Sequence, residues 1–254
     1  MKQSTPKIRL DKLLFERRLA PSRERAQALV LAGKVLVNGQ KIQKSGTPVD
    51  PSSELRLLSE DLKYVSRGGL KLERALEHWK IDVSGRVCVD VGASTGGFTD
   101  CLLQHGAARV IAVDTGQGQI AFRLRQDPRV RLLEKTNARY LRREQLGEIA
   151  EFIAIDVAFI SATLLLPRVV AAAFPEDQQA RSGRELVVLV KPQFEVGREW
   201  VGKGGIVRNP DAQQQAVAKV KASVQELGPA RIDVIESPIR GSEGNREFLL
   251  YAKL

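Results

Sequence analysis

Hydrophobic residues recur along this chain with two different periods, and these periods divide it into a short first part and a longer second part. Apolar residues at helical spacing mark two early helices: Leu10, Leu13 and Leu14, then Ala26, Leu29 and Val30. Ser22 stands where it would cap the second helix, and Gly33 stands where it would end it. Asn38-Gly39 then lies between two short apolar runs, which is typical of a β-hairpin turn. The first part is therefore predicted to contain two helices and a small hairpin.

From about residue 67 the pattern alternates between amphipathic stretches and apolar, β-branched runs. The first amphipathic helix has four apolar residues on one face: Leu72, Ala75, Leu76 and Trp79. Strands are predicted over 87–91, 110–114, 130–133, 152–156, 186–190, 231–236 and 247–253. Helices are predicted over 96–105, 117–126, 140–147, 163–173 and 211–227. This alternation predicts an α/β fold whose largely parallel sheet is covered on both faces.

The spacing of the last two strands distinguishes between two kinds of α/β domain. Only ten residues, Ser237 to Arg246, separate these strands, so they should form an antiparallel hairpin. A parallel dinucleotide-binding domain would need a longer crossover at this point. A terminal antiparallel strand in a seven-stranded sheet is instead typical of the class I Rossmann-like methyltransferases, which bind S-adenosylmethionine.

A glycine-rich turn follows the first strand of the sheet and opens the next helix. It reads Gly92-Ala93-Ser94-Thr95-Gly96-Gly97, with Asp90 before it and Phe98 after it. The turn lacks the G-x-G-x-x-G spacing of NAD-binding domains. A carboxylate at Asp90 would repel a pyrophosphate, but it can hold a cationic amino group or order the loop. The turn is therefore expected to cradle a different nucleotide through its backbone N–H groups.

Two later strand ends add to this expected cofactor site. Asp114 ends the second strand, where an acid commonly accepts hydrogen bonds from ribose hydroxyls. Asn137 and Ala138 follow the third strand and are placed to meet an adenine, although an ordinary turn is the alternative. Together with Asp90 and the turn through Phe98, these residues favour an adenosyl ligand that bears an amino acid, which is S-adenosylmethionine.

The net charge of the chain indicates the kind of partner that it binds. The chain carries a net charge of +10, with 40 Lys and Arg against 30 Asp and Glu. Residues 1–60 hold 12 of these cations and 6 of the acids, so the excess is concentrated in the first part. Such a balance indicates an anionic partner, either nucleic acid or an anionic membrane surface.

Cysteine usage and the absence of long apolar runs narrow the class further. The two cysteines, Cys88 and Cys101, both lie in apolar surroundings, so neither a disulfide framework nor a metal site is expected. The sequence shows neither a signal-peptide pattern nor an apolar run near the ~20 residues that span a bilayer. We therefore expect a soluble, cytoplasmic protein without a membrane partner.

The first part, residues 8–58, resembles the S4 RNA-binding domain in its order of elements and in the basic residues on its helices. A solvated basic face without a partner is the alternative interpretation. The resemblance implies an RNA-binding surface that contains Arg9, Arg17, Arg18, Ser22, Arg23, Arg25, Lys34 and Lys41.

Lysines and acids mark the carboxyl-end edge of the predicted sheet. Asp156 ends the fourth strand and Lys191 ends the fifth, so both should face one crevice. Glu247 opens the last strand, which would insert beside the fifth, so that Glu247 approaches Lys191. Lys71 lies near the start of the first helix of the second part. A structural ion pair explains each residue taken separately, but four such groups in one crevice indicate a catalytic set.

This set resembles the Lys-Asp-Lys-Glu tetrad of FtsJ-like ribose 2′-O-methyltransferases, and the whole chain is similar to the TlyA family of rRNA methyltransferases. The similarity rests on residues 66–72, 90–100, 191–195 and 201–208. Some members of the family bear the label hemolysin. The resemblance implies S-adenosylmethionine-dependent 2′-O-methylation of a cytidine ribose in ribosomal RNA, with Lys71, Asp156, Lys191 and Glu247 as catalytic residues and Asp156 also at the cofactor. The implied partner is ribosomal RNA or a ribosomal subunit, and no obligate protein partner is evident.

Within this tetrad, Lys191 is expected to take or polarise the proton of the 2′-hydroxyl, held by Asp156. Lys71 and Glu247 would fix the hydroxyl. The glycine-rich segment 202–205 is either a lid over the substrate or a surface hairpin.

The expected domain organisation is a disordered tail at 1–7, an S4-like domain at 8–58, a linker at 59–66 and a methyltransferase domain at 67–254. The linker departs from its relatives, which carry Arg-x-Trp-Val where this chain reads Leu62-Lys63-Tyr64-Val65.

Three rival functions remain. A non-catalytic RNA-binding protein would leave the lysine–acid set without a purpose. A membrane-active hemolysin would need a membrane segment, and an NAD-dependent enzyme is disfavoured by the glycine spacing and the terminal hairpin.

Overall fold

The computed structural model describes residues 6–58, 63–241 and 243–254, except for the side chains of Gln178 and Gln179. The chain divides into two compact units, Met1–Leu62 and Lys63–Leu254, and each is described by itself. This division falls inside the expected linker: residues 59–62 lie outside the described residues, whereas residues 63–66 belong to the second unit. Of the expected tail, residues 1–5 also lie outside the described residues.

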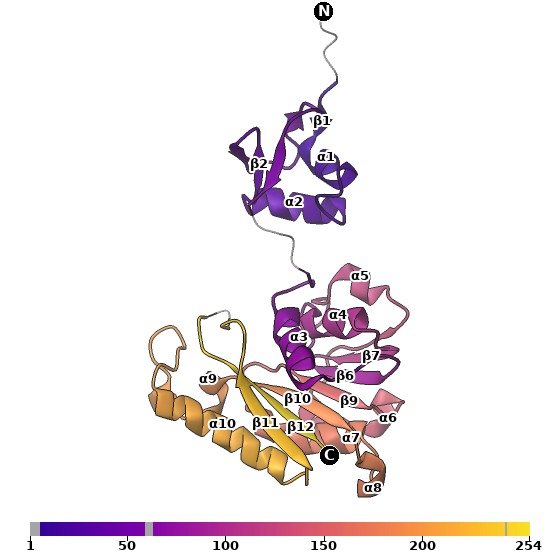
Figure 1. Cartoon of the computed structure of the whole chain (residues 1–254), viewed down its shortest axis with the longest axis vertical. Coiled ribbons are helices and arrows are strands. Elements are labelled where there is room, and N and C mark those ends of the chain that lie inside the picture. Colours follow the sequence, from indigo (N-terminus) through magenta and orange to yellow (C-terminus); the bar gives the residue numbers. More distant parts are fainter. Residues whose placement is uncertain (1–5, 59–62, 242) are drawn as a thin grey trace, which may run out of the picture. The chain divides into compact units, whose positions relative to one another are not determined.

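The N-terminal unit packs two helices against short antiparallel strands (Figure 1). Its helices are α1 (Leu10–Glu16) and α2 (Arg23–Leu31). Its strands are β1 (Ile8–Arg9), β2 (Val35–Val37), β3 (Gln40–Ile42), β4 (Pro48–Val49) and β5 (Leu55–Leu57), paired as β1-β4 and β3-β2-β5. The predicted hairpin is present as β2 and β3, because Asn38 and Gly39 adopt φ values of +48° and +80°, as a tight turn of this type requires.

The core of this unit comes from the apolar stripes that the helical spacing predicted. Leu10, Leu14 and Val30 are fully buried, and they pack with Val35 of β2. Ser22 caps α2 as expected, since its hydroxyl oxygen accepts a hydrogen bond from the backbone N–H of Arg25 at 3.2 Å.

The second unit is built on a seven-stranded sheet with the order β11-β12-β10-β9-β6-β7-β8. The strands are β6 (Val87–Val91), β7 (Arg109–Val113), β8 (Val130–Leu133), β9 (Phe152–Ile155), β10 (Glu185–Val190), β11 (Arg231–Glu236) and β12 (Phe248–Lys253). Strands β6 to β10 run parallel, whereas β12 pairs antiparallel with both β10 and β11. The predicted terminal hairpin and its insertion beside the fifth strand are thereby confirmed.

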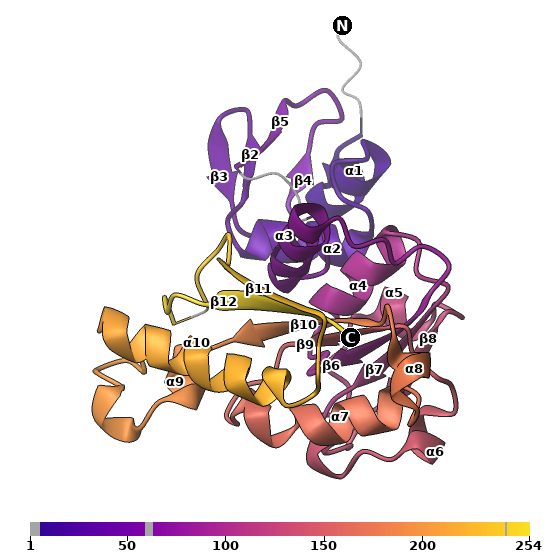
Figure 2. The same ribbon diagram turned by 60° about the horizontal axis from the view of Figure 1, so that its bottom comes forward.

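Helices cover both faces of this sheet, with α3 and α4 on one face and α7 and α10 on the other (Figure 2). The α-helices of the unit are α3 (Gly68–Trp79), α4 (Gly97–Gln104), α5 (Phe122–Arg125), α6 (Arg143–Leu146), α7 (Leu166–Ala173), α8 (Gln178–Arg181), α9 (Pro192–Glu195) and α10 (Pro210–Gln225). Three short 3₁₀ turns are η1 (Ala138–Tyr140), η2 (Ala162–Leu164) and η3 (Arg198–Trp200). None of the helices in the described part of the chain is long and apolar enough to cross a membrane.

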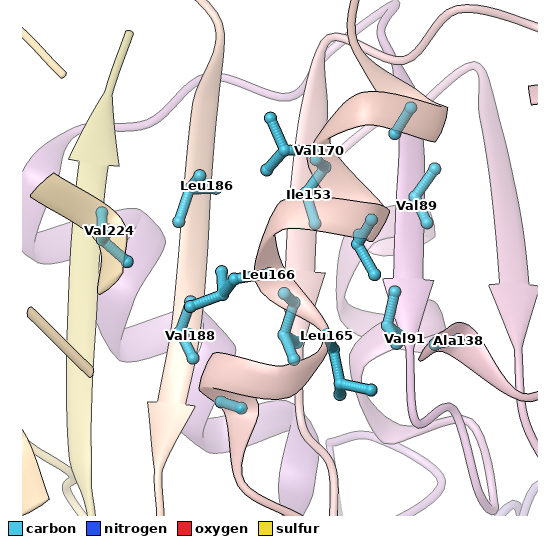
Figure 3. Packing of buried hydrophobic residues seen from close by; sticks show 14 of the residues in the cluster. Val89, Val91, Ala138, Ile153, Leu165, Leu166, Val170, Leu186, Val188 and Val224 are labelled. Atoms are coloured by element: carbon cyan, nitrogen blue, oxygen red, sulfur yellow. The ribbon is translucent and has the colours of Figure 1, made fainter. Parts of the chain in front are cut away.

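The strands are buried on both faces, so consecutive apolar residues join different cores. In β10, Leu186 and Val188 pack toward Leu166 of α7, as Figure 3 shows, whereas Val187 faces the α3 and α4 side. In β6 the same alternation places Asp90 on the α3 and α4 side of the sheet, where it is fully buried. The alternation of side chains along a strand therefore decides on which face of the sheet a candidate cofactor residue lies.

Two predicted helices are shorter than the sequence pattern indicates. The expected helix over 117–126 is reduced to α5, because Gly116 and Gly118 direct the preceding chain into bends whose N–H groups bond to Asp114 and Glu134. The expected helix over 140–147 is split into η1 and α6, with Leu141 in an extended conformation between them.

Candidate active site

The glycine-rich turn after β6 brings the backbone of two strand ends into close contact. Gly92 adopts a φ of +88°, and a Cβ built on it would lie 2.2 Å from the backbone oxygen of Asp156. No other residue type fits this position, because both the left-handed conformation and the missing Cβ are required. The turn therefore places the carboxyl ends of β6 and β9 together, and its own backbone forms part of the wall of two cavities.

Asp90 lies beneath this turn and lines neither cavity. Its Oδ2 accepts a hydrogen bond from the Thr99 hydroxyl at 2.6 Å, and its Oδ1 has no hydrogen-bond partner among the described residues. Burial raises the pKa of Asp90 to about 7, although the hydrogen bond from Thr99 opposes this change. Of the two roles expected for this acid, the geometry matches ordering of the loop, since Thr99 belongs to the helix that the turn opens.

The first cavity has a volume of about 370 Å³ and extends from the glycine turn to the ends of β7 and β8. Asp114, Asn137 and Ala138 all line it. The Asp114 carboxylate accepts the backbone N–H groups of Ser94 at 2.8 Å and Gly116 at 2.6 Å. A carboxylate accepts about four hydrogen bonds, so it keeps capacity for ribose hydroxyls. Asn137 also caps η1 through the N–H of Arg139, which is the turn that the alternative interpretation proposed.

The second cavity, of about 250 Å³, contains all four predicted catalytic residues. Lys191 Nζ and Asp156 Oδ1 form an ion pair at 2.5 Å, with side chains that are 14% and 19% exposed. Lys71 Nζ and Glu247 Oε2 form a second pair at 2.5 Å, with side chains that are 10% and 3% exposed. Glu247 therefore forms its ion pair with Lys71. It also lies near Lys191, as expected, because Val190, the residue before Lys191, is paired with Phe248, the residue after Glu247.

Each member of the set is held by a different element of the fold. Asp156 and Lys191 follow the last residues of β9 and β10, which lie side by side in the sheet. Lys71 is in the first turn of α3, and Glu247 immediately precedes β12, the strand paired with β10. The antiparallel insertion of β12 explains the pairing, because it carries Glu247 back to the carboxyl-end edge of the sheet.

Hydrogen bonds of Glu195 hold the segment that follows Lys191. Its buried carboxylate accepts hydrogen bonds from the Ser161 hydroxyl at 2.5 Å and from the Ala162 N–H at 2.7 Å. Lys219 of α10 donates to the backbone oxygen of Glu195 at 2.8 Å. These contacts fix the short helix α9, which begins directly after Lys191.

The part of the expected linker that is described packs against α3 and α4, and its last residue, Ser66, lines the second cavity. Tyr64 is buried, and its hydroxyl donates to Glu73 of α3 at 2.8 Å. The Val65 N–H donates to Asp100 of α4 at 2.7 Å. Tyr64 therefore packs as a structural aromatic residue, and this segment connects α3 with α4.

The glycine-rich segment 202–205 forms a small hairpin that is closed by a bridge between Gly202 and Ile206. The amide of buried Asn245 holds it, because it accepts from the Val207 N–H at 2.9 Å and donates to the Gly205 oxygen at 2.8 Å. Of the two alternatives left by the sequence, a hairpin matches this geometry.

Several basic residues of the N-terminal unit bind to other residues of the same unit. Arg9 and Arg23 both contact the buried carboxylate of Asp11, with N–O distances of 2.8 and 3.5 Å. Arg17 donates to the backbone oxygens of Pro51 and Ser53. The remaining cations of the predicted RNA-binding surface include three exposed residues, Arg18, Lys34 and Lys41.

Some lining residues were not predicted from the sequence. Ser66, Arg67, Ile239 and Arg240 line the tetrad cavity, and Phe159 and Gln119 line the larger one. Ser66 and Arg67 lie in a motif on which the family resemblance rests, so the motif was a usable signal. The others lie in loops whose course depends on the packed sheet.

The two cavities share Gly92, Ser94 and Asp156 in their walls, so a single ligand can reach from Asp114 to the tetrad. The volume of the larger cavity lies within the range of small-molecule sites. A glycine-rich backbone turn, an acid for ribose hydroxyls and a lysine–acid set beyond them fit S-adenosylmethionine. Fold and site together define a class I, S-adenosylmethionine-dependent methyltransferase.

Comparison with known proteins narrows this class. Residues 64–254 match the FtsJ-like methyltransferase family, and residues 8–55 match the S4 domain. The chain is 43% identical to the 16S/23S rRNA (cytidine-2′-O)-methyltransferase TlyA of Mycobacterium tuberculosis, over 97% of this chain and 90% of that protein. It is also 43% identical to the Bacillus subtilis protein YqxC, provisionally named an rRNA methyltransferase, over 98% of this chain and 86% of that one.

A solved structure with the same two-domain span is that of a Streptococcus thermophilus protein provisionally named a hemolysin. It has a TM-score of 0.71 and 42% identity, and the match covers 98% of this chain and 88% of that one. The chain belongs to the FtsJ-like methyltransferase family, with the TlyA rRNA methyltransferases among its relatives.

Proposed function

We propose that this chain transfers a methyl group from S-adenosylmethionine to the 2′-hydroxyl of a cytidine ribose in ribosomal RNA, with Lys71, Asp156, Lys191 and Glu247 as the catalytic set. The observation that carries the proposal is the presence of two short lysine–carboxylate pairs in one cavity that adjoins the candidate cofactor cavity. The activity named for the Mycobacterium tuberculosis relative supports the choice of cytidine and of rRNA.

When bound, S-adenosylmethionine supplies the methyl group and leaves as S-adenosylhomocysteine. The 2′-oxygen must lose its proton while its new bond to carbon forms. Lys191 Nζ contacts this oxygen and takes or polarises the proton, and Asp156 fixes the direction of the Lys191 side chain.

Lys71 and Glu247 hold the ribose from the other side of the cavity. Their pair is almost fully buried, and it is anchored by α3 on one side and by β12 on the other. Rigid placement of the hydroxyl in line with the methyl donor accounts for much of the rate in a displacement of this kind.

The N-terminal unit docks the RNA through its phosphates. Exposed Arg18, Lys34 and Lys41 provide cations that are free of the internal contacts made by Arg9 and Arg17. Phosphate contacts fix the orientation of the RNA, and the catalytic unit then selects the nucleotide. An rRNA substrate implies a cytoplasmic location and a ribosomal subunit or its RNA as partner.

Mapping of ribose methylation tests this function directly. Ribosomal RNA from cells that lack the protein is incubated with the purified chain and S-adenosylmethionine, and its 2′-O-methyl groups are mapped by resistance to alkaline hydrolysis. We expect new protection next to one or a few cytidines. Methylation of a base, or of no rRNA position, would contradict the proposal. A liposome-leakage assay with the same preparation tests the hemolysin name, and we expect no leakage.

A further inference from the structure

The tetrad cavity contains two cations besides its lysines. Lys71 and Lys191 are each compensated by a carboxylate at 2.5 Å. Arg67 and Arg240 also line the cavity, and both side chains are exposed. The four tetrad residues together bring no net charge, so these arginines are the described lining residues that carry an excess positive charge.

The proposed substrate presents a negative charge at this place. In RNA, the carbon that bears the 2′-hydroxyl adjoins the carbon that bears the 3′-phosphodiester. A 2′-oxygen at Lys191 therefore brings a phosphate to the rim of the same cavity. Since the tetrad is internally compensated, it does not neutralise this phosphate.

Arg240 lies on a loop whose backbone is packed against the tetrad. Its neighbour Gly241 is buried, and a Cβ built on Gly241 would lie 2.4 Å from Glu247 Oε1. The Gly241 N–H donates to the backbone oxygen of Asn245 at 3.0 Å. The Asn245 side chain is in turn held by the hairpin at 202–206. The position of the Arg240 backbone is therefore set by the same contacts that set Glu247.

The guanidinium of Arg240 keeps most of its donors available. Among the described residues, it donates a long hydrogen bond, at 3.3 Å, to the Gly244 backbone oxygen of the same loop. A guanidinium has five N–H donors in a planar fork that fits phosphate oxygens. The loop thus offers a partly oriented phosphate-binding group at the edge of the catalytic cavity.

We propose that Arg240 binds the phosphodiester on the 3′ side of the target ribose and thereby positions the 2′-hydroxyl at Lys191. This inference rests on the proposed function and adds a substrate contact to it.

The first test measures methylation kinetics of the full chain with rRNA from cells that lack the protein. For Arg240→Ala we expect the KM for RNA to rise about tenfold. We also expect the slope of log kcat/KM against log salt to fall by about 1, which corresponds to the loss of one phosphate contact. Arg240→Lys should recover part of the loss. The dissociation constant for S-adenosylmethionine should not change. Arg168→Ala removes an exposed arginine of α7 that lines neither cavity, and it should behave as wild type.

The second test removes the phosphate charge instead of the arginine. An rRNA substrate with a neutral methylphosphonate linkage 3′ to the target should lose about tenfold in kcat/KM with the wild-type chain, and little further with Arg240→Ala. Equal losses in both proteins, or weaker S-adenosylmethionine binding in Arg240→Ala, would overturn the assignment. If the wild-type chain forms no 2′-O-methyl group, the proposed function fails; if it does and Arg240→Ala matches it, this inference alone fails.

Discussion

Among the described residues, one aspartate in each unit is completely buried, and the two carboxylates lie in opposite surroundings. Asp11 of the N-terminal unit and Asp90 of the catalytic unit are both 0% exposed. Asp11 accepts hydrogen bonds from Arg9, from Gln27 and from the Lys12 N–H. Asp90 accepts one from Thr99, and its other oxygen has no partner among the described residues. The hydrogen bond from Arg9 holds the pKa of Asp11 well below its ordinary value, whereas burial raises the pKa of Asp90 to about 7.

The difference reflects two uses of charge. The N-terminal unit compensates its buried acid and leaves cations such as Lys34 and Lys41 exposed, which suits a surface that attracts RNA. The catalytic unit pairs the two lysines of its cavity with carboxylates, Lys71 with Glu247 and Lys191 with Asp156, and leaves Asp90 uncompensated under the glycine-rich turn. Uncompensated burial lowers stability, and such costs are commonly found at functional sites.

The largest expected effect is the loss of catalysis when Lys191 is replaced. Lys191→Ala should reduce methyl transfer by about a thousandfold, in the range usual for loss of a proton-transfer group. Cofactor affinity, measured by calorimetry, should remain nearly unchanged, because the larger cavity is not lined by Lys191. Lys203→Ala, at an exposed lysine of the same unit, is the control and should retain full turnover. Turnover close to wild type in Lys191→Ala would remove Lys191 from the catalytic set.

Exposed cations of the N-terminal unit should act on affinity and not on chemistry. Replacement of Arg18, Lys34 and Lys41 by Ala should lower RNA affinity by about a hundredfold and reduce the slope of log Kd against log salt by about 2–3. The rate of methyl transfer at saturating RNA should stay unchanged. Filter binding at several salt concentrations measures the first effect, and single-turnover methylation measures the second. RNA affinity equal to that of the wild type would contradict the assignment of this surface.

The buried acid of the catalytic unit should make that unit less stable as pH rises. Because the folded-state pKa of Asp90 is about 7, against an ordinary value of 3.8, the folded state retains a proton that the unfolded state has lost between these values. Stability therefore falls as pH rises toward 7. Asp90→Asn should reduce this fall by about 2 kcal/mol, or roughly 4–8 °C in Tm between pH 5.5 and 7.5. Thermal unfolding without cofactor measures it, and an unchanged pH dependence would show that Asp90 is compensated.

The smallest effect, with the opposite sign, is expected at Asp11. Its lowered pKa contributes stability that is present above the ordinary value of 3.8 and is lost as pH falls below it. Asp11→Asn should therefore destabilise the N-terminal unit near neutral pH by about 1 kcal/mol, since Arg9 is 53% exposed and its attraction is screened by solvent. Hydrogen exchange of the α1 and α2 amides at pH 7, compared between the wild type and the variant, measures the difference. Greater protection in the variant at pH 7 would contradict the comparison.

The sequence predicted that the glycine turn and the next two strand ends lie at one edge of the sheet, and residues of all three line one cavity. The glycine turn, Asp114, Asn137 and Ala138 follow successive parallel strands, whose carboxyl ends must meet at one edge. The tetrad was identified through family resemblance, and its members do line one cavity. Their pairing was not predicted, because Lys71 and Glu247 are 176 residues apart and the packing of α3 on the sheet decides which carboxylate Lys71 meets.

The sequence by itself determined the class of fold, because apolar periods of two and 3.6 residues specify strands and helices, and a ten-residue connection specifies a closing hairpin. It also determined the basic character of the N-terminal unit. Only the tertiary structure decided which charges are compensated. Arg17 is bound to carbonyls of a distant turn while Arg18 is exposed, and Asp90 faces a helix layer and not a cavity. Charge compensation depends on contacts between segments far apart in the chain, and local sequence does not specify those contacts.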